Sequence, residues 1–302
     1  MYPLIILASP RSFSSVISAM LGQHPQMYGL PELNLFAADN IEELIEHFES
    51  DGHRTGRRWD GLLRVIAELF MGRQTSGTVS LARKWVLNNS DETTVSVFEK
   101  IMDRVAPRIV VEKSITTVWN DEMLGRALNA FPDTRFIHLT RHPRSHGLSM
   151  MELMNKRGWE IARGIYDHST NPPTPDPQLL WYRINNRIVD ALSRVPVDRK
   201  MQVRGEDLLQ NPEQKLAEIA EWMGLRTDSK AIEEMKHPER SPYASIGPDN
   251  APMGSDHKFL EDPVLKPHRV KDVGLDGKLA WRDDIDSFFP KVSDLAIRLG
   301  YT

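Results

Sequence analysis

The sequence contains no cysteine. This absence excludes disulfide bonds, thiolate zinc sites and cysteine nucleophiles, and it fits a reducing compartment. The net charge of −4 and the absence of long like-charge runs argue against a nucleic-acid surface of the usual basic kind. The N-terminal apolar run at residues 4–8 is too short for a signal peptide or a membrane span. We therefore expect a cytoplasmic protein without a membrane span.

Two further absences bear on the kind of site to expect. The GxxxxGK[ST] segment does not occur, and no apolar strand-like run ends in an aspartate that could hold a magnesium ion. His24 and His142 have no partners at metal-ligand spacing and are interpreted as structural. The sequence therefore favours an anion site that works without a metal.

The pattern of apolar runs predicts an α/β fold. The chain has 302 residues, 40% of them hydrophobic, and no internal repeat, so residues 1–302 can form a single domain. Buried parallel strands are predicted at 4–8, 109–111, 135–139 and, more weakly, 201–203. Helices are predicted at 14–21, 41–48, 61–70, 94–105, 123–130, 179–192 and 212–222. This alternation predicts a doubly wound, mainly parallel sheet of four or five strands with helices on both faces.

Two long segments depart from this alternation. Residues 31–108 have mostly helical patterns and are predicted to form an insertion after the first strand–helix unit. Residues 237–277 are rich in Pro, Gly, Asp and His. The second segment indicates either a long surface loop that closes over a ligand or a plain connector.

The segment IILASPRSFSSV, residues 5–16, predicts an anion site. A short apolar strand runs into a Ser/Arg-rich turn and then directly into a helix. Such a turn directs free backbone N–H groups and the positive end of the helix dipole at a bound anion. Arg11 adds a full charge, and Ser12, Ser14 and Ser15 add hydroxyl donors. The alternative interpretation is an ordinary helix capped by serine.

Two other strand ends carry basic residues. The run TRFIHLT ends at Arg141, and the run RIVVEKS ends near Lys113. Ligands of open α/β sheets bind beyond the carboxyl ends of the strands, so these side chains and Arg11 are predicted to face one crevice. The pattern predicts a ligand with two separated anionic groups, whereas the alternative is a set of solvated surface charges.

These residues together resemble the sulfotransferases that use 3′-phosphoadenosine 5′-phosphosulfate (PAPS). Pro10-Arg11-Ser12-Phe13-Ser14-Ser15 is similar to the family's 5′-phosphosulfate loop, P-R-S-G-[ST]-[ST]. Arg141 and Ser149 match its 3′-phosphate element, including the eight-residue offset. The segments VRGEDLLQNPEQKLAEIAEWMGL and WRDDIDSFFPKVSDLAIRLGY also resemble the family. The resemblance covers most of the chain and implies a P-loop-like fold with PAPS as co-substrate.

The resemblance also implies catalytic roles. QHPQMYGLPELNLF is similar to the segment that carries the catalytic base in protein-tyrosine and bacterial, polyketide-synthase-associated enzymes, and Glu32 occupies the matching place. VEKSITT maps Lys113 onto the lysine that contacts the transferring group. His257 is the alternative base. Residues 254–259 resemble the segment that closes over the 3′-phosphate, which Lys258 would contact. The residues expected to bind the co-substrate are Arg11, Ser12, Phe13, Ser14, Ser15, Arg141, Ser149 and Lys258.

Three positions depart from the family pattern. Phe13 replaces the loop glycine, and glycine is the residue that readily takes a positive φ and lets the backbone approach a ligand. The loop is therefore expected to use a backbone shape that is allowed for phenylalanine or to bind less tightly. Gly205 stands where the family often has Tyr, and Ile115 replaces the usual Pro. Both of these changes are expected to be tolerated.

The predicted reaction is in-line transfer of a sulfuryl group to a hydroxyl of a small-molecule or acyl acceptor. A metal-dependent nucleotide or sugar kinase and a non-catalytic nucleotide-binding relative are the alternatives. The residues that could line an acceptor pocket, or could equally pack in the core, are Tyr28, Leu30, Leu33, Phe36, Trp119, Trp159 and Tyr166. The sequence does not indicate an oligomeric state.

Overall fold

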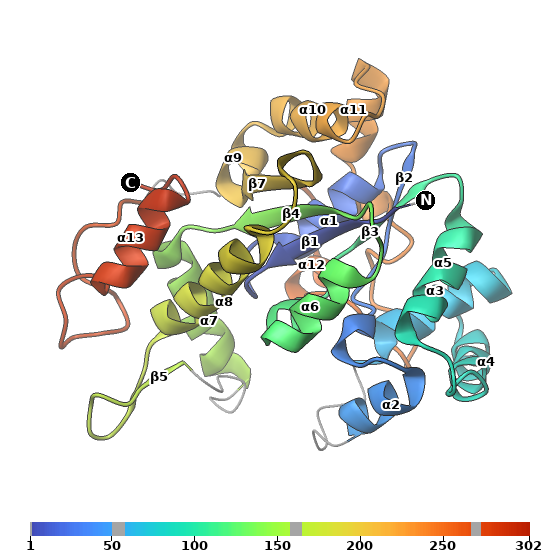
Figure 1. Ribbon diagram of the computed structural model, residues 1–302, viewed down its shortest axis with the longest axis horizontal. Helices are drawn as coiled ribbons and strands as arrows, with labels where there is room; N and C mark the ends of the chain where they lie inside the picture. The colour runs from blue at the N-terminus through green and yellow to red at the C-terminus, as the bar shows by residue number, and fades with distance from the viewer. Residues whose placement is uncertain (1, 50–57, 158–164, 267–272) are drawn as a thin grey trace.

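The computed structural model describes residues 2–49, 58–157, 165–266 and 273–302 (Figure 1). Within these residues five parallel strands form one sheet in the order β2-β3-β1-β4-β7. The strands are β1 Leu4–Ala8, β2 Met27–Gly29, β3 Ile109–Glu112, β4 Arg135–Thr140 and β7 Lys200–Arg204. The prediction of a mainly parallel, doubly wound α/β sheet is confirmed. A small antiparallel pair, β5 Tyr166–Asp167 and β6 Thr174–Pro175, lies outside the sheet.

Both faces of the central strand β1 are buried, as its continuous apolar run predicts, whereas the edge strand β7 is partly exposed. Leu4 and Ile6 of β1 pack into one cluster with α1 (Ser14–Gly22), α10 (Pro212–Trp222) and α11 (Ser229–Met235). Ile5 and Leu7 point to the opposite face and pack with α5 (Thr94–Val105), α6 (Asp121–Asn129) and α8 (Pro177–Leu192). Because successive strand residues alternate between faces, a strand covered on both sides must be apolar throughout.

Most of the described residues between β2 and β3 are helical. The α-helices there are α2 Ile41–Glu49, α3 Asp60–Met71, α4 Ser76–Leu87 and α5, and they gather at the β2 side of the sheet (Figure 1). Helix α4 was not predicted; it begins at Thr75, whose side chain forms a reciprocal capping box with Thr78. Strand β2 was also not predicted. It has three residues, too few for a periodic signal, and it is defined by its pairing with β3.

The remaining helices frame the carboxyl edge of the sheet. They are α7 Pro143–Arg157, α9 Gly205–Gln210, α12 His257–Glu261 and α13 Pro290–Arg298. The described part of the 237–277 segment is mostly irregular and contains the short helix α12. Asp256 begins this helix by accepting a hydrogen bond from the Lys258 N–H, at 3.1 Å.

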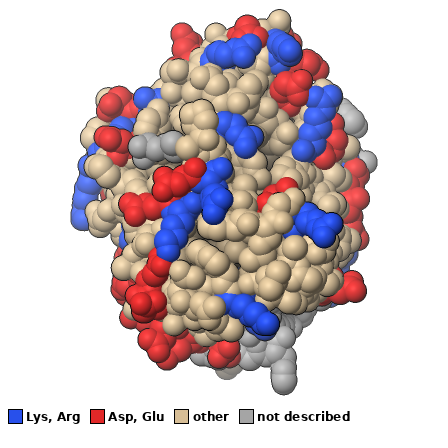
Figure 2. Space-filling view, turned by 90° about the vertical axis from the view of Figure 1, so that its right-hand side faces the viewer, with Lys and Arg blue, Asp and Glu red and all other residues tan. Residues whose placement is uncertain are grey.

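The exterior of the molecule is mixed in charge. Figure 2 shows Lys and Arg side chains interspersed with Asp and Glu side chains on one face, without a continuous basic field. Within the described ranges, no helix is both long and apolar enough to cross a membrane.

Candidate active site

A charged side chain follows every strand of the sheet at its carboxyl edge. In the spatial order of the strands these are Glu32 after β2, Lys113 after β3, Arg11 after β1, Arg141 after β4 and Glu206 after β7. Parallel strands bring their carboxyl ends to the same edge, and this edge is where open α/β sheets bind ligands. The arrangement therefore concentrates charges that are far apart in the sequence.

The turn after β1, residues 9–13, leads into the first turn of α1 at the place where the sequence predicts an anion site. These residues together are called the cradle below. Arg11 and Phe13 both take the left-handed conformation, with φ of 66° and 63°. Phe13 thus adopts the backbone shape that glycine would supply, although a bulky residue resists it. Among the described residues no side chain caps α1, so the N–H groups of its first turn remain available. Ser12 is fully buried beside the cavity, and its Oγ has no hydrogen-bond partner in the described structure.

The two arginine-bearing turns line the same cavity, which has a volume of about 510 Å³. Arg141 donates from Nη1 to the carbonyl oxygen of Arg11 at 2.7 Å. Arg11 donates from Nε to Ser149 Oγ at 3.1 Å. The remaining candidates from the phosphosulfate loop, together with Lys258, also line this cavity. The structure therefore brings the two sequence-predicted anion elements together.

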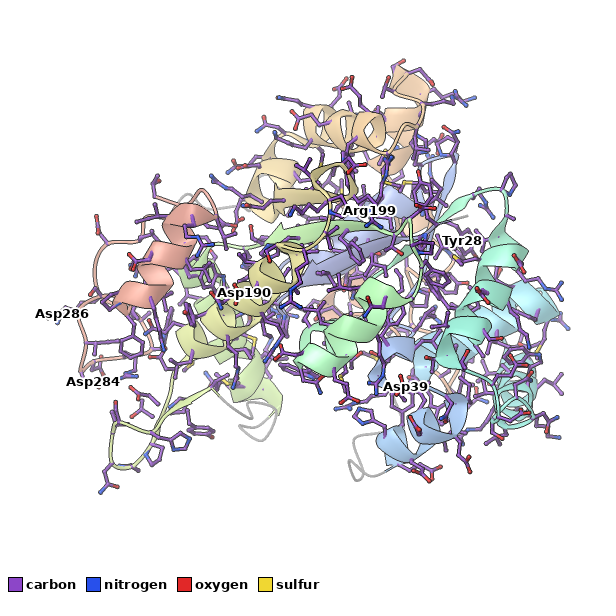
Figure 3. The ribbon with its side chains drawn as sticks, in the orientation of Figure 1. Tyr28, Asp39, Asp190, Arg199, Asp284 and Asp286 are labelled. Atoms are coloured by element: carbon purple, nitrogen blue, oxygen red, sulfur yellow. The ribbon has the colours of Figure 1, made fainter. Side chains whose placement is uncertain are left out.

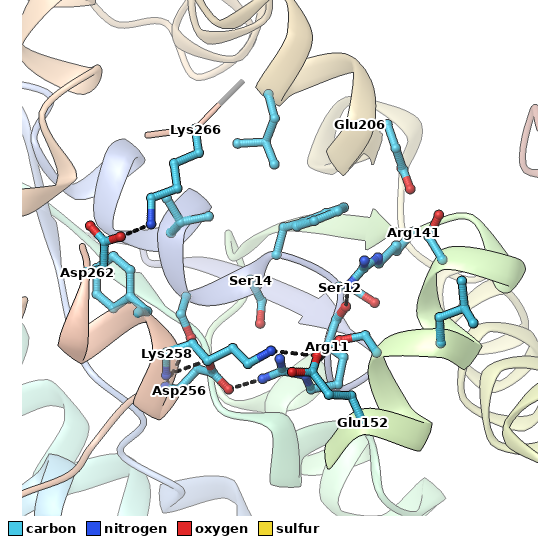
Figure 4. Close-up of a pocket in the computed structure, with 18 of the residues that line it drawn as sticks. Arg11, Ser12, Ser14, Arg141, Glu152, Glu206, Asp256, Lys258, Asp262 and Lys266 are labelled. Atoms are coloured by element: carbon cyan, nitrogen blue, oxygen red, sulfur yellow. Dashed lines mark hydrogen bonds and ion pairs between the residues drawn. The ribbon is translucent and has the colours of Figure 1, made fainter. Parts of the chain in front are cut away.

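Carboxylates neutralise several of the cations in this cavity. The Arg11 guanidinium forms an ion pair with Asp256, Lys258 pairs with Glu152, and Lys266 pairs with Asp262 (Figure 4). The hydrogen bond from Lys258, with a second from Lys156, lowers the pKa of Glu152 to about 2. A dianionic ligand would therefore replace a carboxylate at Arg11 rather than approach a bare charge.

Glu32 and Lys113 meet beside the cradle. Lys113 Nζ lies 2.5 Å from Glu32 Oε1 and donates to Ser15 Oγ at 3.2 Å. Lys113 is 3% exposed, so its charge is shielded from water and acts strongly on its neighbours. The Glu32 N–H donates to the carbonyl oxygen of Gly254 at 2.7 Å. The described part of the 237–277 segment thus makes two contacts at the site. Gly254 contacts Glu32, the predicted base, and Asp256 contacts Arg11.

A buried hydrogen-bond network holds the Glu32 segment against the end of β3. Asn34 donates its N–H to Ser114 Oγ at 2.8 Å and accepts from Thr116 Oγ1 at 2.8 Å. Ser114 in turn donates to Glu112, whose other carboxylate oxygen has no partner among the described residues. Because each of these groups is buried and most are paired, the network resists displacement of Glu32 relative to Lys113.

The pKa of Glu112 leads to a prediction about pH. Burial raises this pKa from 4.5 to about 7, against the opposing effects of the Ser114 hydrogen bond and Lys113. Between these two values the folded chain keeps a proton that the unfolded chain has released, so stability falls as pH rises. We expect Glu112→Gln to raise the free energy of unfolding by about 2 kcal/mol more at pH 8 than at pH 5, measured by urea denaturation. Glu122→Gln, at an exposed ion pair, is the control, and an equal effect of Glu112→Gln at both pH values would contradict the prediction.

Other sequence-predicted residues lie apart from the cavity. His257 pairs with Glu261 at 3.2 Å and is not among the residues that line it. His24 hydrogen-bonds the Arg226 carbonyl, and His142 packs edge-on against Tyr301. Trp119 packs partly buried against the core, and Trp159 falls outside the described residues. Four of the residues that were considered for an acceptor pocket are buried in the core: Tyr28, Leu30, Leu33 and Phe36. Tyr166 lies in β5.

Sequence reasoning found Glu32 but missed the acidic residues that line the cavity. Asp256 and Glu152 pair with cations in the cavity, and Glu206 accepts a hydrogen bond from the His142 N–H at 2.8 Å. No local pattern marks Asp256, because it lies 245 residues from Arg11 in the sequence. Glu206 lies in the segment VRGEDLLQNPEQKLAEIAEWMGL, which resembles the family. Its contact with the backbone of His142, next to Arg141, was not evident from the sequence.

Comparison with known proteins decides the family. The sequence profile described as "Sulfotransferase family" matches residues 3–229. The chain belongs to the sulfotransferase family. Its fold is similar to the "Sulfotransferase Domain from the Curacin Biosynthetic Pathway", with a TM-score of 0.78 at 20% identity, covering 100% of this chain and 98% of that one. It is also similar to the "Sulfotransferase Domain from the Synechococcus PCC 7002 Olefin Synthase", with a TM-score of 0.75 at 22% identity, covering 100% and 95%.

This family membership makes the chain a transferase of the EC 2.8.2 type. The resemblance drawn from the cradle, the Arg141 turn and the Glu32 segment is thereby confirmed at the level of family and fold. No curated protein sequence matches the chain. In the described portion of this sulfotransferase, no group of three or more His, Asp or Glu side chains is placed to hold a metal ion.

Proposed function

We propose that this sulfotransferase moves a sulfuryl group from PAPS to a hydroxyl of a small-molecule or acyl acceptor, with Glu32 as general base. The observation that carries the proposal is the pairing of Arg11 and Arg141 in one cavity at the ends of adjacent strands. Two buried polar atoms at this cavity, Ser12 Oγ and Arg141 Nε, have no partner among the described residues. Unsatisfied buried donors of this kind fit a ligand with several anionic oxygens.

Each residue of the site has a separate role in this reaction. PAPS would supply the sulfuryl group and an adenosine bisphosphate leaving group. Arg11, Ser14 and the N–H groups of the cradle would bind the phosphosulfate, while Arg141 and Ser149 would bind the 3′-phosphate. Glu32 would take the proton of the acceptor hydroxyl as its oxygen attacks sulfur. Lys113, between Glu32 and Ser15, would stabilise charge on the oxygen that leaves.

Titration calorimetry tests the donor. We expect adenosine 3′,5′-bisphosphate to bind the protein in the presence of EDTA, and ATP with Mg²⁺ to bind much more weakly. Incubation with ³⁵S-labelled PAPS and a panel of alcohols, phenols and hydroxy fatty acids should then yield a labelled product. Preference for ATP with Mg²⁺ would favour a kinase, and nucleotide binding without any labelled product would favour a non-catalytic relative. Either result overturns the proposal.

Asp256→Asn should increase nucleotide affinity. The substitution removes the carboxylate that occupies Arg11, yet asparagine can still cap α12, so the segment should keep its shape. Because the ion pair is partly exposed, we expect about a threefold lower Kd for adenosine 3′,5′-bisphosphate at low salt. Asp228→Asn is the matched control, since Asp228 caps α11 away from the cavity. A weaker or unchanged Kd in Asp256→Asn would contradict the expectation.

A further inference from the structure

Phe13 lies directly against Arg141, the arginine that follows β4 and that we propose to bind the 3′-phosphate. The guanidinium carbon of Arg141 is 4.3 Å from the centre of the Phe13 ring. This distance is within the range of a cation–π contact, in which a planar guanidinium stacks on the ring face. A guanidinium held in this way keeps the edges that carry its N–H donors free for the oxygens of an anion.

The backbone around Arg141 is fixed independently of this ring. Trp181 donates from Nε1 to the Arg141 carbonyl at 2.7 Å, and Glu206 accepts the next backbone N–H, that of His142. The side chain has fewer restraints. Nη1 donates to the Arg11 carbonyl, whereas Nε, although buried, has no partner in the described part of the chain. The Phe13 ring and the Arg11 carbonyl are therefore the two described contacts that set the plane of the guanidinium, and only the ring belongs to a side chain that can be changed.

The space for this ring depends on Gly205. A Cβ atom at position 205 would lie 2.6 Å from Phe13 Cδ2, closer than real contacts allow, and 3.3 Å from the carbonyl oxygen of Thr140. Position 205 does not take a positive φ, so the backbone conformation does not require glycine there. What matters is that glycine has no side chain and leaves room for the ring. A side chain at 205 would have to push the ring away from Arg141.

We propose that Phe13 is a positioning residue that orients the Arg141 guanidinium for the 3′-phosphate of the nucleotide, and that Gly205 provides the space for it. The inference rests on the proposed function, because it needs a ligand that carries this phosphate. It explains together two of the three departures from the family pattern, those at positions 13 and 205. The residue that replaces the loop glycine uses the volume that a side chain at 205 would have occupied.

The test compares two nucleotides that differ only in the 3′-phosphate. Calorimetry with adenosine 3′,5′-bisphosphate and with 5′-AMP gives the ratio of their dissociation constants. We expect Phe13→Leu to weaken bisphosphate binding about tenfold and to leave 5′-AMP binding unchanged. Phe13→Tyr keeps an aromatic face and should bind as the wild type does. All of these variants keep an L-residue at positive φ, so the backbone strain is matched.

A double-variant cycle tests the role of Gly205. Gly205→Ala should reproduce the tenfold loss, because the added methyl group displaces the ring. In Phe13→Ala the ring is absent, so adding Gly205→Ala should cost nothing more. Melting temperatures of all variants show whether each remains folded.

The outcomes separate this inference from the proposed function. A wild-type protein that binds neither nucleotide overturns the proposed function and removes the ligand on which the inference depends. A wild-type protein that prefers the bisphosphate, combined with a Phe13→Leu variant that shows the same preference, overturns the inference alone. Equal losses for both nucleotides in Phe13→Leu would also overturn it, because they would mean that the ring supports the whole loop. Additive losses in the double variant would overturn the role of Gly205.

Discussion

Replacing Glu32 by Gln should lower the turnover number by about 10²- to 10⁴-fold, the usual contribution of a general base. Glutamine has the same shape and can still accept the hydrogen bond from Lys113, so the geometry of the pair should be kept. The backbone hydrogen bond from residue 32 to Gly254 does not involve the side chain and should remain. What is lost is the carboxylate that accepts the proton of the acceptor hydroxyl.

The measurement is the initial rate of ³⁵S transfer from labelled PAPS to the best acceptor of the hydroxyl panel. Calorimetry with adenosine 3′,5′-bisphosphate should give the wild-type Kd, because Glu32 does not line the nucleotide cavity. His257→Asn is the discriminating comparison. A wild-type rate in Glu32→Gln together with a large loss in His257→Asn would make His257 the base.

The second large effect is on stability. Arg282→Met should lower the free energy of unfolding by about 3–5 kcal/mol, the usual cost of breaking a buried ion pair from one side. Arg282 is 3% exposed and contacts Asp176 at 2.8 Å and Asp167 at 3.0 Å. Burial raises the pKa of Asp176, and hydrogen bonds from Trp281 and Gln178 together with the charge of Arg282 oppose this rise. Removing the arginine leaves this carboxylate buried without a countercharge.

This cluster joins the segment before α13 to the start of α8. Asp284, labelled in Figure 3, also holds Arg282 but is exposed, so Asp284→Asn should destabilise the protein far less than Arg282→Met. The double variant Arg282→Met/Asp176→Asn should recover part of the loss, because asparagine can still begin α8 and carries no buried charge. Urea denaturation measures all three variants. A loss of less than 1 kcal/mol in Arg282→Met would contradict the prediction.

Much of the framework could be predicted because it depends on local pattern. The run at 4–8 matches β1 at both ends, since a strand buried on two faces must be apolar at every position. Arg11 and Arg141 were expected in one crevice because parallel strands place their carboxyl ends on one edge, and the structure places them there. β2 and α4 escaped prediction, because a three-residue strand has no periodicity and α4 exposes Leu81 and Leu87, which obscures the apolar pattern of its buried face.

The details of the site depend on contacts between distant segments. Asp256 reaches Arg11 across 245 residues, and Gly205 makes room for Phe13 across most of the chain. Each of these residues is chemically ordinary in its own segment, so no window of sequence could assign it a partner. The identity of the strands, the cradle and its arginines follows from local chemistry and strand direction. The packing of the folded segments decides which carboxylate neutralises which cation and which side chain fills the space beside a glycine. The reason is that ion pairing and excluded volume act only between atoms that folding brings into contact.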